Sequence, residues 1–308
     1  RRARQQAADA GAAGASAAME ETRLNVIAEA KVAFYHVLFA QRDAELAGQN
    51  VTMVEEVLRT VKARVAAGDA TLFETMKATV EVQKAKKEVA RAQNALVVVR
   101  AKLDLVTAGM LGRQFSIQGD FESLQQGLDL DVLSARAMEQ HPTLRRLTKL
   151  VEQAQFSATL ERESRIPNVT MQGSYHREAG DESVTAGLSV PLPLWYQRQG
   201  EIETALGARH RAEAERMRAQ NEITQAITQH VQDVRTANEQ LQVFETGLLK
   251  QAEQTLRVAR ISFQQGAASL LDLLDSQRVY RQTLLEYVQA RADLSIALAR
   301  LERAVGGI

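Results

Sequence analysis

The sequence predicts a mainly α-helical protein in which a long antiparallel coiled-coil helical hairpin occurs twice, with one β-hairpin between the two copies. Three observations predict this fold class. All four prolines lie between Pro142 and Pro193, so residues 1–141 and 194–308 lack the strongest helix breaker. Apolar residues recur in heptads on both sides of this window. Inside the window the apolar period changes to two, which is typical of strands.

Composition excludes several kinds of function. The 308 residues carry 38 Lys and Arg against 38 Asp and Glu, so no net charge draws the chain onto nucleic acid. There is no cysteine, which excludes disulfides, thiolate nucleophiles and cysteine-ligated zinc. No apolar run in the helical regions approaches the ~18 residues that a membrane-spanning helix needs. We therefore expect no nucleic-acid partner and no helix that crosses a bilayer.

Heptad columns predict the long helices. The first column contains Val82, Ala85, Val89, Ala92, Leu96, Val99, Leu103 and Val106. The second contains Leu270, Leu273, Gln277, Tyr280, Leu284, Tyr287, Arg291, Leu294, Leu298, Leu301 and Val305, so that only Gln277 and Arg291 interrupt it. A 3.5-residue spacing kept over this many turns winds helices around neighbours, so these helices need partners.

The two helical regions are copies of each other. Residues 62–74 (KARVAAGDATLFE) align without gaps on residues 260–272 (RISFQQGAASLLD), at an offset of 198 residues. At the same offset Val82 falls on Tyr280, so the heptad register is shared as well. This is the pattern of a duplicated helical hairpin.

Each copy carries the signals of a tight tip. Gly68 and Gly266 can take the left-handed conformation that ends a helix. Thr71 and Ser269 can then cap the returning helix. We predict that the two hairpins pack side by side with both tips at the same end.

Residues 168–192 predict the β-hairpin. One face would carry Val169, Met171, Gly173 and Tyr175 from the first strand and Val184, Ala186, Leu188, Val190 and Leu192 from the second. The turn would be Ala179–Glu182. An ordinary half-buried hairpin is the alternative, but the rest of the chain offers no sheet to receive it. Two strands cannot satisfy their own edges, so we expect them to join strands from other copies or from sequence outside this chain.

No catalytic chemistry is visible. The five histidines are scattered and form no His-Glu-x-x-His motif. There is no glycine-rich phosphate loop and no Gly-x-Ser-x-Gly elbow. We therefore expect no enzyme, no cofactor and no protein-bound metal.

Two groups of residues stay ambiguous on sequence alone. Asp272 and Asp275 lie one helical turn apart, and they are either helix-start acids that favour the helix dipole or a functional pair. Tyr175, Trp195 and Tyr196 are either an aromatic belt at a membrane interface or core filling.

Four stretches resemble the TolC-like outer-membrane efflux family, and the resemblance covers essentially the whole chain. They are residues 266–275 (GAASLLDLLD), 191–200 (PLPLWYQRQG), 137–144 (AMEQHPTL) and 165–169 (RIPNV). The PLPL stretch is most similar to the outer-membrane subunits of heavy-metal cation exporters of the cobalt-zinc-cadmium and copper-silver type.

The resemblance implies a passive channel in the outer membrane of a Gram-negative cell, with most of the chain in the periplasm. A homotrimer would build a β-barrel in outer-membrane lipid and a long tunnel, which would export heavy-metal cations or other small toxic compounds. A periplasmic adaptor protein and an inner-membrane proton-driven pump would be its partners. The implied segments are a first-repeat hairpin (1–110), a linker (111–141), a second-repeat helix (142–166), a transmembrane β-hairpin (167–195) and a second-repeat hairpin (196–308).

The resemblance also implies site residues. The adaptor would grip the tips at Gly68, Asp69, Ala70, Thr71, Gly266, Ala267, Ala268 and Ser269. An acidic ring at the channel entrance would contain Asp272 and Asp275, with Glu74 as the acid of the first repeat. The lipid-facing strand residues would be Val169, Met171, Tyr175, Val184, Ala186, Leu188 and Val190.

The sequence departs from the family in two respects. It has Ala268 where a basic residue is expected and Phe263 where an aromatic hydroxyl is expected, so the family's closing contacts are not assumed. The family's first β-hairpin would precede the helix that begins near Ala12, and the sequence starts too late to contain it. A soluble coiled-coil scaffold and a periplasmic adaptor remain alternatives, although the scaffold leaves the β-hairpin idle and an adaptor should show one helical hairpin flanked by Gly-rich β-domains.

Overall fold

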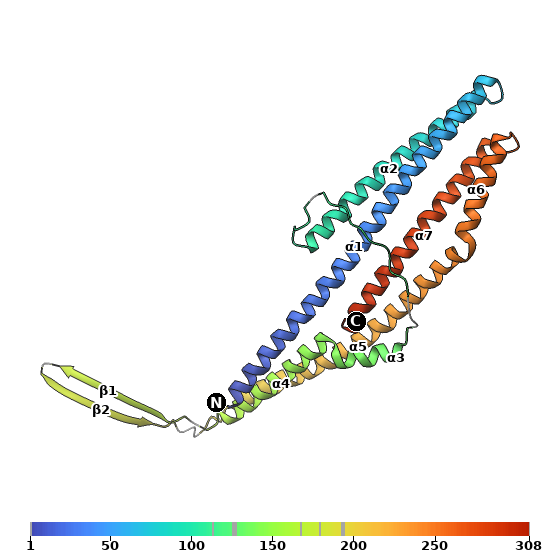
Figure 1. Cartoon of the computed structure of the whole chain (residues 1–308). Coiled ribbons are helices and arrows are strands. Elements are labelled where there is room, and N and C mark those ends of the chain that lie inside the picture. Colours follow the sequence, from blue (N-terminus) through green and yellow to red (C-terminus); the bar gives the residue numbers. More distant parts are fainter. Residues whose placement is uncertain are drawn as a thin grey trace. The chain divides into compact units, whose positions relative to one another are not determined.

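The computed structural model describes residues 2–112, 114–124, 128–166, 168–178, 180–191 and 195–307. Its elements are α1 (Arg2–Ala67), α2 (Leu72–Val106), α3 (Leu130–Gln140), α4 (Pro142–Glu163), β1 (Thr170–Glu178), β2 (Asp181–Ser189), α5 (Gln199–Val243), the π-helical turn η1 (Phe244–Leu248), α6 (Leu249–Gln264) and α7 (Leu270–Val305) (Figure 1). The predicted fold class, long helical hairpins plus one β-hairpin, is confirmed.

The chain divides into two compact units. The first contains Arg1–Thr22 and Arg136–Thr224, and the second contains Arg23–Ala135 and Gln225–Ile308. The long helices α1 and α5 therefore each contribute to both units.

In the first unit, α4 packs on the start of α1 through a polar cluster. Glu21 of α1 accepts hydrogen bonds from the Thr143 hydroxyl at 2.9 Å and from Arg146 Nε at 2.6 Å. The end of α4 is joined to the start of α5, because Arg198 forms an ion pair with Glu161. These pairs join α1, α4 and α5 within the first unit.

The β-hairpin has the predicted faces. The cross-strand pairs on its apolar face are Met171 with Leu188, Gly173 with Ala186, and Tyr175 with Val184. Directly paired residues point to the same side of a sheet, so this register collects the apolar residues of both strands on one face.

The predicted strand ends need correction. Asp181 already pairs with Glu178, so β2 includes the Asp181 and Glu182 that were expected in the turn. β2 stops at Ser189, since Pro191 has no N–H to continue the ladder. Leu192, expected as the last strand residue, lies outside the described residues, as does the Pro193 that follows it.

In the second unit, both tips lie at the same end, as predicted (Figure 1). The tip core collects residues from four helices: Val57 and Val61 of α1, Ala78 of α2, Leu256 and Phe263 of α6, and Leu270 and Leu273 of α7. The two heptad columns supply much of the buried surface of α2 and α7, as their 3.5-residue spacing requires.

The segment after α2 is held against the helices of the second unit. Phe121 is buried in a cluster that includes residues of α1 and α7. Ser295 Oγ accepts a hydrogen bond from the Glu122 N–H at 2.9 Å, and Arg291 pairs with Asp120 at 3.1 Å. The interruption of the heptad column at Arg291 therefore has a structural reason, because this side chain binds the linker.

The second long hairpin is not continuous, which differs from the prediction. The π-helical turn Phe244–Leu248 separates α5 from α6, and Gly247 within it has a φ of 157°. A glycine inside a helical pattern was the available signal, because glycine tolerates backbone angles that other residues avoid. None of the described helices has an apolar stretch that is long enough to cross a membrane.

Candidate channel entrance and membrane hairpin

Both tips end their first helix in the same way. Gly68 has a φ of 82°, and the Asp69 N–H donates to the Arg64 carbonyl at 2.9 Å. Gly266 has a φ of 75°, and the Ala267 N–H donates the equivalent bond at 2.8 Å. This is the helix ending in which a left-handed glycine closes the last turn, so the glycine prediction is confirmed at both tips.

Both returning helices are capped as predicted. The Thr71 hydroxyl accepts a hydrogen bond from the Glu74 N–H at 3.4 Å. Ser269 and Asp272 form a reciprocal capping box, in which the Asp272 N–H donates to Ser269 Oγ at 3.2 Å and the Ser269 N–H donates to Asp272 Oδ2 at 3.0 Å. Glu74 and Asp272 therefore occupy the same position of the two repeats, third after the cap.

The two tips are joined by Arg64. Its Nη1 donates to the Phe263 carbonyl at 3.2 Å, and its guanidinium lies 4.9 Å from the centroid of the Phe263 ring. Phe263 is only 2% exposed and belongs to the tip core, so Arg64 contacts a core residue of the other tip. Arg64 was not among the residues predicted from the sequence. A basic residue in the last turn of a helix was a signal for carbonyl binding, but it could not identify a carbonyl of another helix.

The structure shows what each acidic residue contacts within the chain. Asp272 accepts from both the hydroxyl and the N–H of Ser269, and these hydrogen bonds lower the pKa of its carboxyl below the usual value for aspartate. Asp275 forms an ion pair with Arg278 at 2.6 Å, and its side chain is more than half exposed. Among the described residues, no hydrogen bond or ion pair joins Glu74 to either aspartate.

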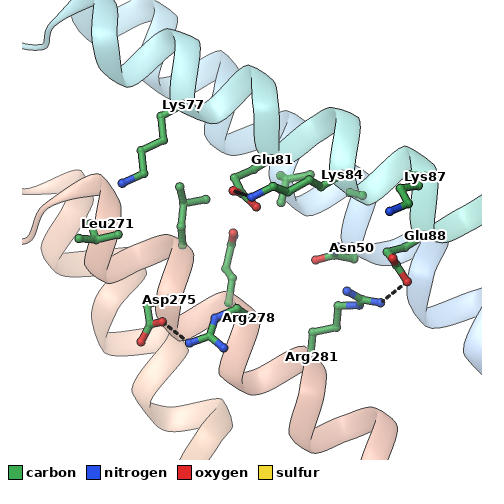
Figure 2. Close-up of a pocket in the computed structure, with 14 residues that line it drawn as sticks. Asn50, Lys77, Glu81, Lys84, Lys87, Glu88, Leu271, Asp275, Arg278 and Arg281 are labelled. Carbon is green, nitrogen blue, oxygen red and sulfur yellow. Dashed lines mark hydrogen bonds and ion pairs between the residues drawn. The ribbon is translucent and has the colours of Figure 1, made fainter.

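Asp275 lies at a groove of about 600 Å³ between α2 and α7. Figure 2 shows side chains of both signs lining it, with Asp275 paired to Arg278 and Glu88 paired to Arg281. The charged residues of the lining are Lys77, Glu81, Lys84, Lys87, Glu88, Asp275, Arg278 and Arg281. The lining therefore carries five cationic and three anionic side chains, and Arg278 is the cation that pairs with Asp275.

Gln277 lies in the same groove and is buried to 3% exposure. Neither its Oε1 nor its Nε2 has a hydrogen-bond partner among the described residues. A buried amide without partners costs stability. The described part of the chain contains no group of three or more His, Asp or Glu side chains that could hold a metal ion.

The apolar face of the β-hairpin is open to the surroundings. All seven predicted lipid-facing residues are exposed in the single chain, and Val184 reaches 80%. Trp195 is 92% exposed, and Tyr175 and Tyr196 are more than half exposed, so these aromatic residues do not fill a core within the chain. The alternative of an ordinary half-buried hairpin is wrong for the described residues.

Repeated helical hairpins with joined tips, together with a β-hairpin whose apolar face is uncovered, define a class of mainly helical proteins that carry one exposed β-hairpin. The chain belongs to the outer membrane efflux protein family, whose sequence model matches residues 1–109 and 133–307. The resemblance noted in the sequence is thereby confirmed. The protein is an efflux protein of the outer membrane, and this family is not a family of enzymes.

Individual relatives are distant. The cobalt-zinc-cadmium resistance protein CzcC of Cupriavidus metallidurans is 25% identical over 294 residues, which are 95% of this chain and 70% of that protein. A membrane protein from Pseudomonas aeruginosa has a TM-score of 0.86 at 19% identity, covering 99% of this chain and 71% of its own. The outer membrane protein VceC from Vibrio cholerae has a TM-score of 0.83 at 19% identity, covering 99% of this chain and 75% of its own. At these identities the two structures show the fold alone.

Proposed function

We propose that the protein is the outer-membrane subunit of a tripartite efflux system, a passive trimeric conduit that exports heavy-metal cations or other small toxic compounds. The observation that carries the proposal is the β1–β2 hairpin, which has an uncovered apolar face and open backbone edges. In lipid every backbone edge has to be paired, so a membrane hairpin needs strands beyond this pair. Other copies of the chain, together with sequence outside it, would supply such strands.

The cargo is proposed from the similarity to CzcC, whose name records resistance to cobalt, zinc and cadmium. A passive conduit needs no metal ligands of its own. The test is metal accumulation in cells that lack the gene, with and without a plasmid copy. The plasmid copy should lower the cellular content of zinc, cobalt or cadmium. Equal metal content in both strains would contradict the proposal that these metals are exported through the channel.

The two tips are proposed as the binding site of the periplasmic adaptor protein. The adaptor would couple the channel to an inner-membrane proton-driven pump. Gly68, Asp69, Gly266 and Ala267 are exposed and lie at the same end of the second unit. A tight turn with small side chains lets a partner helix approach the backbone closely. Cross-linking from position 69 or 267 should capture the adaptor.

The acidic ring is proposed for the trimer. Asp272 and Asp275 are exposed, so three-fold symmetry can collect them around an axis, together with Glu74 of the first repeat. Crowded carboxylates attract cations, so the ring should make the entrance prefer cations over anions. The alternative role, capping α7 and pairing with Arg278, predicts unchanged conduction in Asp272→Asn/Asp275→Asn. Reversal potentials and block by divalent cations separate the two roles.

Membrane insertion of the hairpin is tested by two neighbouring substitutions. Val184 faces the apolar side of the sheet and Thr185 the polar side. Arginine on a lipid-facing position costs ~2–4 kcal/mol at mid-membrane, whereas a position facing the water-filled interior tolerates it. Val184→Arg should therefore reduce the amount of assembled protein in the outer membrane, and Thr185→Arg should not. Equal loss from both substitutions would argue against the barrel.

A further inference from the structure

A buried amide without hydrogen bonds lines the groove between α2 and α7, which has a volume of about 600 Å³. We call this site the α2–α7 groove. Gln277 is 3% exposed, and neither its Oε1 nor its Nε2 has a hydrogen-bond partner among the described residues. Leaving both groups unpaired lowers stability, and an apolar side chain of the same length would avoid this cost. A ligand that satisfies the amide has to supply one donor and one acceptor.

The α2–α7 groove carries an excess of positive charge. Each of its three carboxylates already has a cationic partner, in the pairs Glu81 with Lys84 at 2.7 Å, Asp275 with Arg278 at 2.6 Å and Glu88 with Arg281 at 3.8 Å. Glu88 also binds Arg91 at 2.8 Å, so two guanidinium groups share it. Lys77 and Lys87 also line the groove, and neither forms a hydrogen bond or ion pair with another described residue. The spare positive charge favours an anion as the ligand.

Three helices of the second unit build the α2–α7 groove. α2 contributes the lysines, α7 contributes Gln277 and the two arginines, and α1 adds Asn50 and Val54. Figure 2 shows Lys77 extending from α2 into the space toward α7. The volume is that of a small-molecule site, in which a few polar groups orient the ligand between apolar walls. Here the apolar residues of the lining are Val54, Ala85, Leu271 and Leu274.

We propose that the α2–α7 groove binds a small oxyanion that also carries a hydroxyl group, the chemistry shared by hydroxycarboxylates and hydrogen phosphate. The negative oxygens of the ligand accept hydrogen bonds from Lys77 and from Gln277 Nε2, and its hydroxyl donates to Gln277 Oε1. The bound anion thereby joins α2 to α7, which belong to different hairpins. The site lies within one chain, so the inference goes beyond the proposed channel and does not depend on a trimer.

Two pairs of probe anions test the ligand chemistry by isothermal titration calorimetry of the purified protein. Citrate is compared with tricarballylate, which has the same carboxylates but no hydroxyl, and hydrogen phosphate is compared with sulfate. At mildly alkaline pH the two members of each pair carry the same charge. In at least one pair the hydroxyl-bearing anion should bind at least about tenfold more tightly, because its analogue leaves Gln277 Oε1 unpaired. That pair then identifies the ligand as a hydroxycarboxylate or as phosphate. Equal or weaker binding of the hydroxyl-bearing anion in both pairs, or no binding at all, would overturn the proposal.

Substitutions separate ligand binding from stability. Gln277→Met keeps the length of the side chain but removes the amide, so the free energy of unfolding without ligand should stay the same or rise. The same substitution should abolish the discrimination between the two anions of the pair. Lower stability together with unchanged discrimination would show that Gln277 has only a structural role, and would contradict the proposal.

A second substitution tests the charge of the site. Lys77→Gln should raise the dissociation constant of the anion at least about fivefold, because a charged donor is lost. The matched control is Lys102→Gln, which removes the same charge from an exposed position ~38 Å further along α2. Equal effects of the two substitutions would show general attraction of anions to the protein and would overturn the site.

Chemical protection locates the bound anion. Acetic anhydride modifies lysine side chains, and mass spectrometry of the digested chain measures the extent of reaction at each position. The anion that binds in calorimetry should slow acetylation of Lys77 several-fold and leave Lys102 unaffected. Equal rates at Lys77 with and without the anion would refute this location, and the proposed channel function would stand unchanged.

Discussion

Replacing Arg64 by methionine should loosen the contact between the two tips. Methionine keeps an apolar stem but loses the hydrogen bond to the Phe263 carbonyl and the stacking on the Phe263 ring. A hydrogen bond from a charged donor contributes ~1.5–3 kcal/mol to stability. We take the lower value of ~1.5 kcal/mol because the Arg64 side chain is only partly buried. The cation–π contact adds ~0.5–1 kcal/mol at an exposed site. The loss of about 2 kcal/mol should raise the population of separated tips about 30-fold.

Spin labels at Ala70→Cys and Ala267→Cys measure this separation by pulsed electron paramagnetic resonance, because no native cysteine interferes. Arg64→Met should broaden the distance distribution toward longer values. The matched control is Arg260→Met, which removes the pair between Arg260 and Glu56 at 3.4 Å. Both of these side chains are about half exposed, and such pairs contribute ~0.2–1 kcal/mol. Identical distributions for the two variants would refute the role given to Arg64.

Three further predictions concern single sites. Phe263→Ala should lower the free energy of unfolding of the second unit by ~3–5 kcal/mol in urea titrations, because it empties a site in the tip core; a loss below ~1 kcal/mol would contradict this packing. Asp272 has a lowered pKa in the folded chain, so its carboxylate adds stability above the usual aspartate pKa of ~4, and that stability is lost as the pH falls through the lower folded pKa. The stability difference between the native protein and Asp272→Ala should therefore be present at neutral pH and vanish in strong acid, and a difference that persists there would count against the capping box. Ser295→Ala should cost ~1–3 kcal/mol and speed amide exchange at Glu122, whose N–H loses its acceptor; unchanged exchange there would rule out this clamp.

The sequence predicted what depends on local chemistry. Gly68, Gly266 and the two caps follow from backbone angles and hydrogen bonds within a few residues, so their outcome did not depend on the rest of the fold. The pair between Asp275 and Arg278 has helical i, i+3 spacing and is also local, but Arg278 was not among the predicted site residues.

The contacts that join distant segments were not readable. Arg64 and Phe263 are 199 positions apart, and the residues next to either one in the sequence do not identify its partner. Arg291 interrupts the apolar heptad column of α7 because its side chain binds Asp120 of the linker, and the heptad pattern does not indicate this contact. Gln277 interrupts the same column, and the structure gives it no partner among the described residues. A periodic pattern shows that a position faces a neighbour, but it does not identify the neighbour's chemistry.

The two copies of the helical hairpin are similar at the tips and differ in the groove between them. At the offset of 198 residues the positions that build a tip are kept in kind, as with Thr71 and Ser269. The positions that line the groove between α2 and α7 are not kept, since Lys77 corresponds to Asp275. Two identical hairpins packed side by side would place like charges at such equivalent positions, and like charges in a shared groove repel. Lys77 and Asp275 carry opposite charges instead, so this pair of equivalent positions adds no such repulsion between the two copies of the hairpin.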